Sequence, residues 1–556
     1  MLFRWLRHRT LAELKLRLKA AKVLQRSHDP VGHFRILNRL ALSPLWLAVD
    51  RGEGAAGGME AQFELCIRQK LVQRLMGGAL GDLVVATAFP EKSICPACPG
   101  EWRAIFEQHG IRVRTIVSWL RWGLVIGICY RAGLRRGIGL IGYGWKSGSE
   151  IWDGTTEVVV LPSLGYENIS TSEPGSATSF TFTSWVLEKY PRAAGKLIRA
   201  HVPGALTKQF AERAWVEPEP FEQLNGLKSK IRFTFICLFL MVVAAVRLLW
   251  GRWKEAFALA EIVELAYVRE AGIGKATDYL FCNTEFQLRP LWTYLAEKAG
   301  ANVRFAFYST NSMYIGAGTE TSIAMTPGYV SMSWPGYLLW DAYQVDFIRS
   351  ALARPAEMEI VGPIDYSDGD GGVPAVLAQD APTFAVFDVS AFQPILAATK
   401  GILDPYYTVK TVNTFLLDVS EVLTLAGATM LYKRKRPFIR LAATAYKRQV
   451  ERIVARINVV VIDPKVSARR VIHCAHATIS LPYTSTALIA NADGIPSVYY
   501  DPMGWLPARS AQGHEILVLR GRAELKAWVM AQIDAIRGTT SGLAPYAGDF
   551  RRGRYA

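Results

Sequence analysis

The fold is decided by the stretch Ile479-Ser480-Leu481-Pro482-Tyr483-Thr484-Ser485-Thr486-Ala487, which places a hydroxyl-rich turn between an apolar segment and a helix. The apolar segment 471–481 is expected to be largely buried, and residues 487–492 predict a helix that stops near Asp493-Gly494. Residues 494–501 then return as a β-branched and aromatic strand. Strand, turn, helix and strand in this order are typical of an α/β fold.

The turn favours a bound phosphate. Thr484, Ser485 and Thr486 fall on the N-terminus of the predicted helix, where unsatisfied backbone N–H groups and the positive end of the helix dipole gather. An ordinary N-cap at Thr484 or Ser485 is the competing interpretation. Because α/β sheets bind ligands at the carboxyl ends of their strands, we favour a nucleotide-phosphate site formed by Pro482 and the three hydroxyl residues.

A run of cations is expected at the same edge. Lys433-Arg434-Lys435-Arg436-Pro437 directly follows the predicted strand 426–432. Lys433, Lys435 and Arg436 are therefore predicted to neutralise the phosphates of a nucleotide or the charge of a leaving group. A basic patch that contacts lipid headgroups is the alternative.

The chain is long enough for more than one domain, since 556 residues exceed what one hydrophobic core usually serves. Short apolar strands alternate with helical stretches from about Val158 onward, which predicts an α/β fold with a pair of Rossmann-type domains. The Gly- and Asp-rich run divides them into 151–364, a linker at 365–381, and 382–556. Asp368-Gly369-Asp370 lies in this linker and is interpreted as a solvated hinge, because a metal-binding pair is expected at the end of a buried strand.

The basic balance of the chain points to a membrane surface or to anionic substrates. The formal net charge is +16, and residues 1–50 alone hold ten Lys and Arg against three acids. Leu11, Leu14 and Leu18 recur there at helical spacing, so region 1–150 is predicted to associate with anionic lipid, with a solvated surface helix as the alternative. Nucleic-acid-binding motifs are absent from the sequence, which argues against nucleic acid as a partner.

Two apolar segments strengthen the membrane interpretation. The first, 115–130, is interrupted by Arg121, and the second, 233–246, is an uncharged run of fourteen residues inside an apolar insertion near 231–253. A bilayer span needs about 20 apolar residues. We therefore expect the second segment to dip into one leaflet, with a single span or a buried helix as alternatives. No signal peptide is recognisable, so the expected location is the cytoplasmic face of the inner membrane, peripheral or monotopic.

Cysteine usage gives no sign of a metal or a disulfide framework. The seven cysteines are scattered, and Cys95-Pro96-Ala97-Cys98 has no second pair at metal-ligand spacing. No metal site is expected.

The order of short motifs resembles a family of bacterial polysaccharide-biosynthesis proteins recognised by a Pro-Phe-Thr-Ser motif. This resemblance implies a glycosyltransferase of the two-domain GT-B type. Pro482-Tyr483-Thr484-Ser485 matches that motif with Tyr for Phe. The similarity covers roughly residues 275–505, and its other motifs are Arg289-Pro290-Leu291-Trp292-Thr293, Phe307-Tyr308-Ser309-Thr310-Asn311, Leu339-Trp340-Asp341, Val361-Gly362-Pro363-Ile364 and Val386-Phe387-Asp388-Val389.

The resemblance implies a membrane-bound glycosyltransferase of capsule or lipopolysaccharide biosynthesis that moves a sugar from a nucleotide-sugar donor to a glycan or lipid-linked acceptor. The donor is a substrate, so no cofactor is expected. More distantly, the basic strand end and the Thr/Ser turn resemble transferases of CMP-activated acidic sugars such as Kdo or sialic acid. Arg436-Pro437 stands where those enzymes have His-Pro, which leaves the nucleotide open. A transferase of CDP-activated polyol phosphates and a non-catalytic scaffold of polysaccharide assembly are the alternatives.

An inverting, metal-independent GT-B mechanism needs a carboxylate base for the acceptor hydroxyl. Glu285 and Asp388 are the predicted catalytic residues, because each follows a predicted strand, and Glu320 is a further carboxylate in a Gly/Thr-rich loop. In the GT-B architecture the base usually comes from the first half, which favours Glu285. His473 and His476 are expected to serve in packing or capping.

Overall fold

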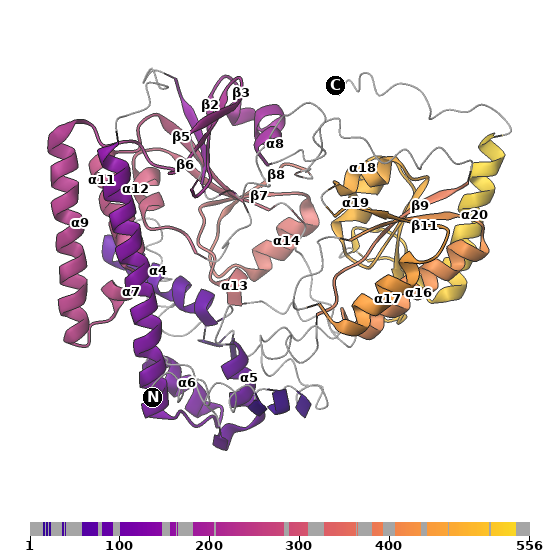
Figure 1. The fold of residues 1–556 in the computed structure, drawn as a ribbon, viewed down its shortest axis with the longest axis horizontal. Helices are drawn as coiled ribbons and strands as arrows, with labels where there is room; N and C mark the ends of the chain where they lie inside the picture. The colour runs from indigo at the N-terminus through magenta and orange to yellow at the C-terminus, as the bar shows by residue number, and fades with distance from the viewer. Residues whose placement is uncertain are drawn as a thin grey trace.

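The computed structural model describes residues 58–75, 80–92, 100–146, 156–162, 182–204, 207–282, 288–307, 327–362, 381–392, 406–434, 442–464, 466–510 and 513–540, with isolated residues between 15 and 40 and at 164, 309 and 364. These residues form two α/β domains that lie beside each other (Figure 1). The predicted α/β class with parallel sheets is confirmed by the strand pairing described below.

The first domain is built on an eight-stranded sheet within the described residues. Its neighbouring strands pair in parallel, except that β3 runs antiparallel to β4 at one edge. In spatial order the strands are β3 (Lys208–Ala211), β4 (Ala214–Glu217), β2 (Leu197–His201), β1 (Val158–Leu161), β5 (Ala276–Cys282), β6 (Asn302–Ala306), β7 (Gly336–Leu339) and β8 (Glu357–Ile360).

The second domain has a six-stranded sheet in which every pair of neighbours is parallel. The strands lie in the order β11 (Val459–Ile462), β10 (Thr429–Lys433), β9 (Thr383–Phe387), β12 (Ala477–Ser480), β13 (Ser497–Asp501) and β14 (Val518–Arg520). Counted within this domain the spatial order is 3-2-1-4-5-6, which is the order of a doubly wound dinucleotide-binding sheet. The direction of strand addition therefore reverses between β9 and β12.

Helices cover both faces of each sheet. The helices of the first part of the chain are α4 (Met59–Arg74), α5 (Leu80–Ala88), α6 (Gly100–Gln108), α7 (Thr115–Trp145), α8 (Phe182–Lys189), α9 (Gly226–Leu249), α10 (Lys254–Phe257), α11 (Leu259–Ala271), α12 (Trp292–Lys298), α13 (Pro327–Val330) and α14 (Ala342–Ala351). Those of the second are α16 (Val409–Leu425), α17 (Thr444–Val454), α18 (Ala468–His473), α19 (Ser485–Ala492) and α20 (Arg522–Thr540). In the second domain α16, α17 and α20 pack on one sheet face, while α18 and α19 pack on the other.

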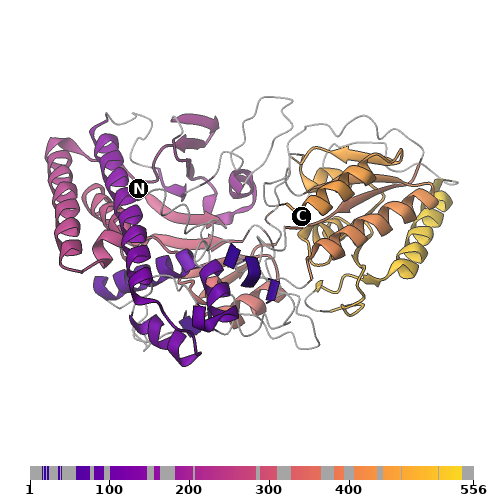
Figure 2. The same cartoon turned by 60° about the horizontal axis from the view of Figure 1, so that its bottom comes forward.

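Glycines bring α7 close to its neighbours. A Cβ on Gly133 would lie 2.5 Å from Leu259 Cβ of α11, and one on Gly137 would lie 2.8 Å from Cys237 Sγ of α9. The two glycines are four residues apart, so they share one side of α7. Small residues at this spacing let helices approach closely. The result is a layer in which α9 lies on the outside and α11 packs against the sheet (Figures 1 and 2).

The helices before residue 115 pack on the first domain. Lys70 of α4 donates to Glu261 of α11 at 2.6 Å, and both side chains are buried. The amide of Gln69 donates to the carbonyl of Ser331 at 3.0 Å, while its oxygen accepts from the N–H of Arg289. Buried polar groups of this kind are costly when unpaired, so these bonds fix α4 against the sheet.

The observed elements differ from the expected ones in three places. The segment 471–481 is predicted to be largely buried, and residues 471–472 and 477–481 are; the structure divides the segment between the end of α18 and β12, with the exposed His473 and His476 between the two buried parts. The apolar segments 115–130 and 233–246 belong to much longer helices, α7 with 31 residues and α9 with 24. Most of the predicted linker 365–381, together with Asp368 and Asp370, lies outside the described residues, as do Cys95 and Cys98.

The close packing of α7 predicts that alanine substitutions at two of its glycines change the stability of the protein in opposite directions. Gly133→Ala is expected to destabilise the protein by about 1–3 kcal/mol, because the new methyl group overlaps Leu259. Gly139→Ala meets no atom within 4 Å and is expected to stabilise α7 by up to about 1 kcal/mol. Thermal unfolding of the two variants beside the parent protein checks this, and equal shifts for both would contradict the packing.

Candidate active site

The Pro-Tyr-Thr-Ser turn lies at the carboxyl end of β12, beside the point where the strand order reverses. The N–H of Leu481 donates to the carbonyl of Phe387 at 2.9 Å, which joins the turn to the end of β9. Ligands of doubly wound sheets bind outside the carboxyl ends of the strands at such a reversal. The turn therefore stands where the topology of the sheet creates a binding position.

Two tyrosines hold the turn through its carbonyl groups. The hydroxyl of Tyr407 donates to the carbonyl of Pro482 at 2.8 Å, and that of Tyr499 donates to the carbonyl of Thr484 at 3.1 Å. Tyr483 adopts a φ of 60°, which is unusual for a residue with a side chain, and its ring packs edge-on against Tyr499. Strained backbone of this kind persists only where the surroundings enforce it and is common at functional sites.

The hydroxyl groups of the turn are not used as an ordinary cap. Thr484 occupies the N-cap position of α19, but its Oγ1 donates back to the carbonyl of Leu481 at 2.9 Å and accepts from no N–H of the helix. The hydroxyls of Thr486 and Ser480 share a hydrogen bond of 2.8 Å. Within the described part of the chain, the N–H groups of Ser485 and Thr486 donate to no acceptor.

These two N–H groups stand at the positive end of α19, and the Ser485 hydroxyl also makes no hydrogen bond to a described residue. The first turn of a helix attracts anions through such groups. Ser467 is an instructive contrast, since its side chain accepts from the N–H of Arg470 and so caps α18 in the ordinary way. The ordinary-cap interpretation fits Ser467 and does not fit Thr484 or Ser485.

Lys433 reaches the same edge through strand register. Phe387 pairs with Lys433 of β10 on one side and with Ser480 of β12 on the other, so the three residues end their strands together. The Lys433 side chain is mostly buried. Lys435 and Arg436 lie outside the described residues, so their predicted roles stay predictions.

Asp388 follows β9 at the same edge and is buried. Its Oδ2 accepts from the hydroxyls of Tyr432 at 2.8 Å and Tyr446 at 2.7 Å, while its Oδ1 has no partner among the described residues. Burial raises the pKa of Asp388 to about 6, although the two tyrosines and Arg434 act in the opposite direction. This geometry suits a residue that positions the strand end, and the predicted catalytic role of Asp388 stays a prediction.

Glu285 and Glu320, the other carboxylates considered from the sequence, lie outside the described residues. The end of β5 just before Glu285 is described. In the first sheet β5 is the neighbour of β1, where the strand order also reverses. The described end of β5, Cys282, thus lies beside the reversal point of the first sheet, and the predicted role of Glu285 stays a prediction.

A contact between the domains lies close to the Pro-Tyr-Thr-Ser turn. Asp341 comes just after β7 and caps α14, and its carboxylate lies 2.8 Å from Nε2 of His514 in the second domain. Gly513 next to it is packed against the ring of Tyr483, since a Cβ there would lie 2.9 Å from that ring. His514 and Glu515 share with Tyr483 a positive φ, and these are the only non-glycine residues in the described part of the chain that do so.

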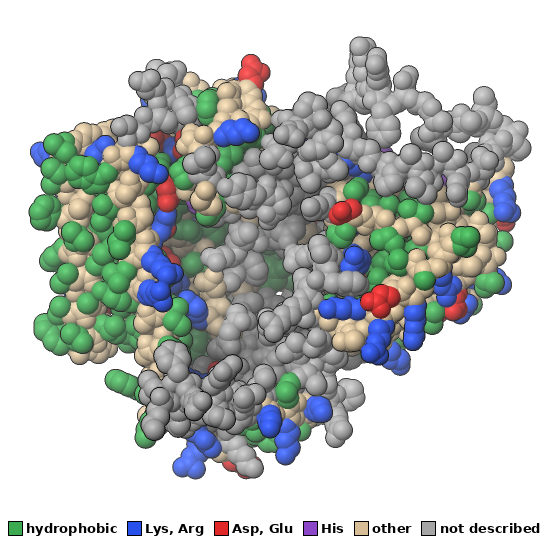
Figure 3. Space-filling view, viewed as in Figure 1, with side chains coloured by type: hydrophobic (Ala, Val, Ile, Leu, Met, Phe, Trp, Pro, Cys, Tyr) green, Lys and Arg blue, Asp and Glu red, His purple; other side chains and the backbone are tan. Residues whose placement is uncertain are grey.

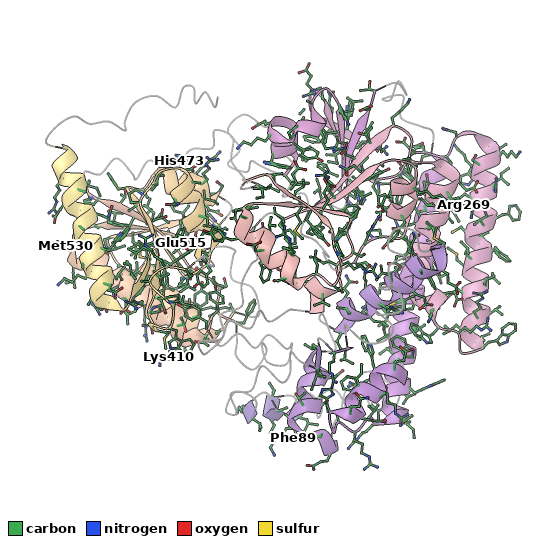
Figure 4. All side chains as sticks on the ribbon, turned by 180° about the vertical axis from the view of Figure 1, so that it is seen from behind. Phe89, Arg269, Lys410, His473, Glu515 and Met530 are labelled. Carbon is green, nitrogen blue, oxygen red and sulfur yellow. The ribbon has the colours of Figure 1, made fainter. Side chains whose placement is uncertain are left out.

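Sequence reasoning missed this contact. Asp341 falls in the motif Leu339-Trp340-Asp341 and His514 falls in no motif, and residues so far apart in the chain give no local pattern that would pair them. The predicted structural roles of the two other histidines agree with their contacts: His473 pairs with Asp493 at 2.8 Å, and His476 accepts from the N–H of Thr383 at 3.1 Å. Figure 4 shows His473 and Glu515 on the second domain.

The described residues contain no cluster of three or more His, Cys, Asp and Glu suited to a metal ion.

The raised pKa of Asp388 predicts a pH dependence of stability. Because the pKa is about 6 in the folded protein and near 3.8 otherwise, the contribution of this group is fully present below about pH 4 and is lost as the pH rises through about 6. The loss amounts to roughly 3 kcal/mol. Asp388→Asn removes the titration, so its stability relative to the parent is expected to improve between pH 4 and pH 7. Denaturant unfolding across this range checks it, and a difference independent of pH would contradict it.

Comparison with known proteins gives one family and several weak structural similarities. A search of curated proteins found no significant match. Solved structures that align with the chain include a Burkholderia xenovorans α,α-trehalose-phosphate synthase (UDP-forming) at 9% identity over 69% of this chain and 94% of that one, with a TM-score of 0.37. Phytolacca americana UGT2 with UDP-2-fluoro-glucose and pterostilbene aligns at 11% identity over 69% and 92%, with a TM-score of 0.34. A putative UDP-N-acetylglucosamine 2-epimerase from Listeria monocytogenes aligns at 9% over 71% and 92%, with a TM-score of 0.36.

These TM-scores are too low to support an inference about activity. The sequence family is a firmer finding, because the profile described as polysaccharide biosynthesis PFTS motif protein matches residues 242–529, just over half of the 556 residues. The match runs from within α9 to within α20 and includes the turn at 482–485. The resemblance seen in the sequence is confirmed, and this chain belongs to the polysaccharide biosynthesis PFTS motif family.

Proposed function

We propose that this protein is a glycosyltransferase of surface-polysaccharide biosynthesis, capsule or lipopolysaccharide, that binds a nucleotide-sugar donor at the turn 482–486. The observation that carries the proposal is the position of this turn. It presents the N–H groups of Ser485 and Thr486, which have no partner among the residues that the structure describes, beside the point where the order of a parallel sheet reverses. Membership of the family supplies the biological setting, polysaccharide biosynthesis.

The proposed chemistry uses the turn to stabilise the leaving group. The acceptor hydroxyl attacks the anomeric carbon of the donor sugar, a new C–O bond forms, and the bond between that carbon and the donor phosphate oxygen breaks. The departing phosphate takes the electron pair. Lys433, the two N–H groups and the N-terminus of α19 lie at one sheet edge, and in this proposal they stabilise that negative charge. Lys435 and Arg436 add cations in this proposal.

The acceptor is proposed to approach from the first domain. The contact between Asp341 and His514 brings the residue after β7 close to the segment that packs on Tyr483, and this supports an acceptor bound on the side of the first domain. A carboxylate there removes the proton of the acceptor hydroxyl, and Glu285 is the proposed base. In this scheme the charges of the protein suffice for the leaving phosphate, so metal independence is part of the proposal.

The identity of the nucleotide in the donor has two candidates. A CMP-activated acidic sugar such as Kdo or sialic acid is the donor favoured by the sequence, and a glycan or lipid-linked acceptor on the cytoplasmic face of the inner membrane completes the reaction. A CDP-activated polyol phosphate would use the same phosphate-binding groups, so a panel of nucleotides separates the two possibilities.

Calorimetric binding of CMP, CDP, UDP and GDP to the purified full chain tests the site. Ser485→Ala is expected to weaken binding of the preferred nucleotide by roughly 10- to 150-fold, because one hydrogen bond to a charged phosphate is worth about 1.5–3 kcal/mol. Its effect on the melting temperature should be small, since the Ser485 hydroxyl bonds to no described residue.

Ser467→Ala is the matched control. It removes a true N-cap in the same domain, so it should cost about 1 kcal/mol of stability and leave nucleotide binding unchanged. If the folded parent protein binds none of the four nucleotides, or if both serine variants bind equally well, the proposed donor site is wrong.

A further inference from the structure

The outer face of α9 is apolar and exposed. Phe235 is 72% exposed, Phe239 67% and Val242 60%, and these side chains recur at intervals of three and four residues along the helix. The opposite side is buried through Phe233, Cys237, Met241 and Ala244, which belong to the core under the first sheet. Both faces of α9 are therefore apolar, but only one packs against the part of the protein that the structure describes.

α7 extends this exposed surface. Its N-terminal half exposes large apolar side chains beside the C-terminal end of α9, where Trp122 packs against Trp253 at 4.7 Å. The helices run side by side in opposite directions, since Tyr130 of α7 donates to the carbonyl of Met241 and Trp145 donates to Thr234. We define the α7–α9 face by the exposed residues Ile116, Trp119, Leu120, Leu124, Ile128, Phe235, Leu238, Phe239, Val242, Val246, Leu249 and Trp250.

The α7–α9 face is unlike the surface of an ordinary monomer. Soluble monomers rarely expose contiguous apolar patches larger than a few hundred Å². α9 is also the one described helix that is long and apolar enough to cross a membrane. Figure 3 shows the hydrophobic side chains gathered over these helices at the edge of the molecule far from the second domain.

Basic residues border the face. Lys228 lies at one end of α9 and Arg252 beyond the other, while Arg131 and Arg135 continue the exposed side of α7. Within the described part of the chain these four cations form no ion pair. A second copy of the chain docked on this face would bring like charges together, whereas anionic lipid headgroups complement them.

The packing of α9 decides how it meets the lipid. Its buried side contacts α7 and α11 along the length of the helix, and α11 in turn packs on the sheet. A transmembrane α9 would carry these helices, with the buried Lys70–Glu261 pair, into the hydrocarbon. Lying in the plane of the membrane, α9 exposes only its apolar side to the acyl chains and keeps the cations at headgroup level.

We propose that the α7–α9 face inserts into one leaflet of an anionic membrane with both helix axes parallel to the bilayer plane. The inference goes beyond the proposed transferase function and does not rest on it, because no residue of the second domain takes part. The proposed insertion involves α7 as well as α9. The N-terminal half of α7 carries the exposed tryptophan and leucines, which form a single surface with α9.

Vesicle flotation of the full chain tests insertion. The triple variant Phe235→Ser/Phe239→Ser/Val242→Ser is expected to lose binding to phosphatidylcholine vesicles that contain phosphatidylglycerol. Leu425→Ser/Ile457→Ser is the control, since it removes exposed apolar side chains from the second domain and should float like the parent. Arg131→Gln/Arg135→Gln is expected to lower the preference for anionic vesicles roughly fivefold per arginine, with the greatest effect at low salt.

Orientation needs a separate measurement. Lys228→Cys and Arg252→Cys mark the two ends of α9, and a membrane-impermeant maleimide is added outside sealed vesicles, with the parent protein as the background. Labelling of both positions is expected for a helix in the plane of the membrane. Protection of one end alone would show a span and overturn the proposal.

Two other results would also overturn it. Undiminished flotation of the triple variant would mean that lipid contacts lie elsewhere. A parent that fails to float but dimerises in lipid-free buffer, with a monomeric triple variant, would assign the face to a second copy. Circular dichroism and nucleotide binding of each variant show whether it folds, and loss of nucleotide binding alone would bear on the donor site and not on the membrane face.

Discussion

The parallel pairing of β9 with both β10 and β12 is the constraint on which the candidate site depends. One residue, Phe387, stands in register with Lys433 on one neighbour and Ser480 on the other. A slip of one residue in either pair would turn the strand's side chains to the opposite face of the sheet. The cation, Asp388 and the Pro-Tyr-Thr-Ser turn meet at one edge because this register is fixed by buried strands on both sides.

The sequence predicted the part of this arrangement that is local. The turn, the helix after it and the returning strand follow from apolar periodicity and turn chemistry over about twenty residues. The side-chain geometry of Thr484 could not be predicted, because a threonine at a helix start has two choices, the N–H groups ahead or the carbonyl behind. Only the tyrosines that hold the turn from other segments decide between them.

Long-range electrostatics account for most of what was missed. β2 and β4 carry charged residues, which suggests exposed chain, but Arg199 is buried and pairs with Glu217 at 2.8 Å on the neighbouring strand. A charged residue in a strand indicates exposure to solvent unless a residue of opposite charge pairs with it on a neighbouring strand. The local sequence does not show which strands will be neighbours. The pair His514 and Asp341 is similar, since neither residue has a local pattern that announces a contact between domains.

The motifs that resemble the family serve two structural purposes: one stabilises the packing of the first domain, and others lie where the two domains meet. Arg289 bonds to Thr293 within its own motif and to the carbonyl of Ser333, and Trp292 packs edge-on against Phe221 and against Tyr279 of β5. That motif therefore braces the first domain, whereas Asp341 and the Pro-Tyr-Thr-Ser turn lie where the two domains meet. Similar short signatures in the sequence thus serve different physical purposes.

The place of α9 in the chain has a consequence for biogenesis. Val158 of β1 pairs with Leu197 on one side and with Ala276 on the other, and α9 is synthesised between these two partners. During translation this helix leaves the ribosome before α11 and β5 exist to cover its inner side, and closing such a long loop is slow. In the proposed membrane-bound form, a bilayer close to the ribosome would cover the apolar surface of α9 until α11 and β5 have been synthesised. If the α7–α9 face inserts into lipid as proposed, a chain made far from a bilayer would expose α9 to other nascent chains, and its yield would then depend on where it is translated as much as on how stable it becomes.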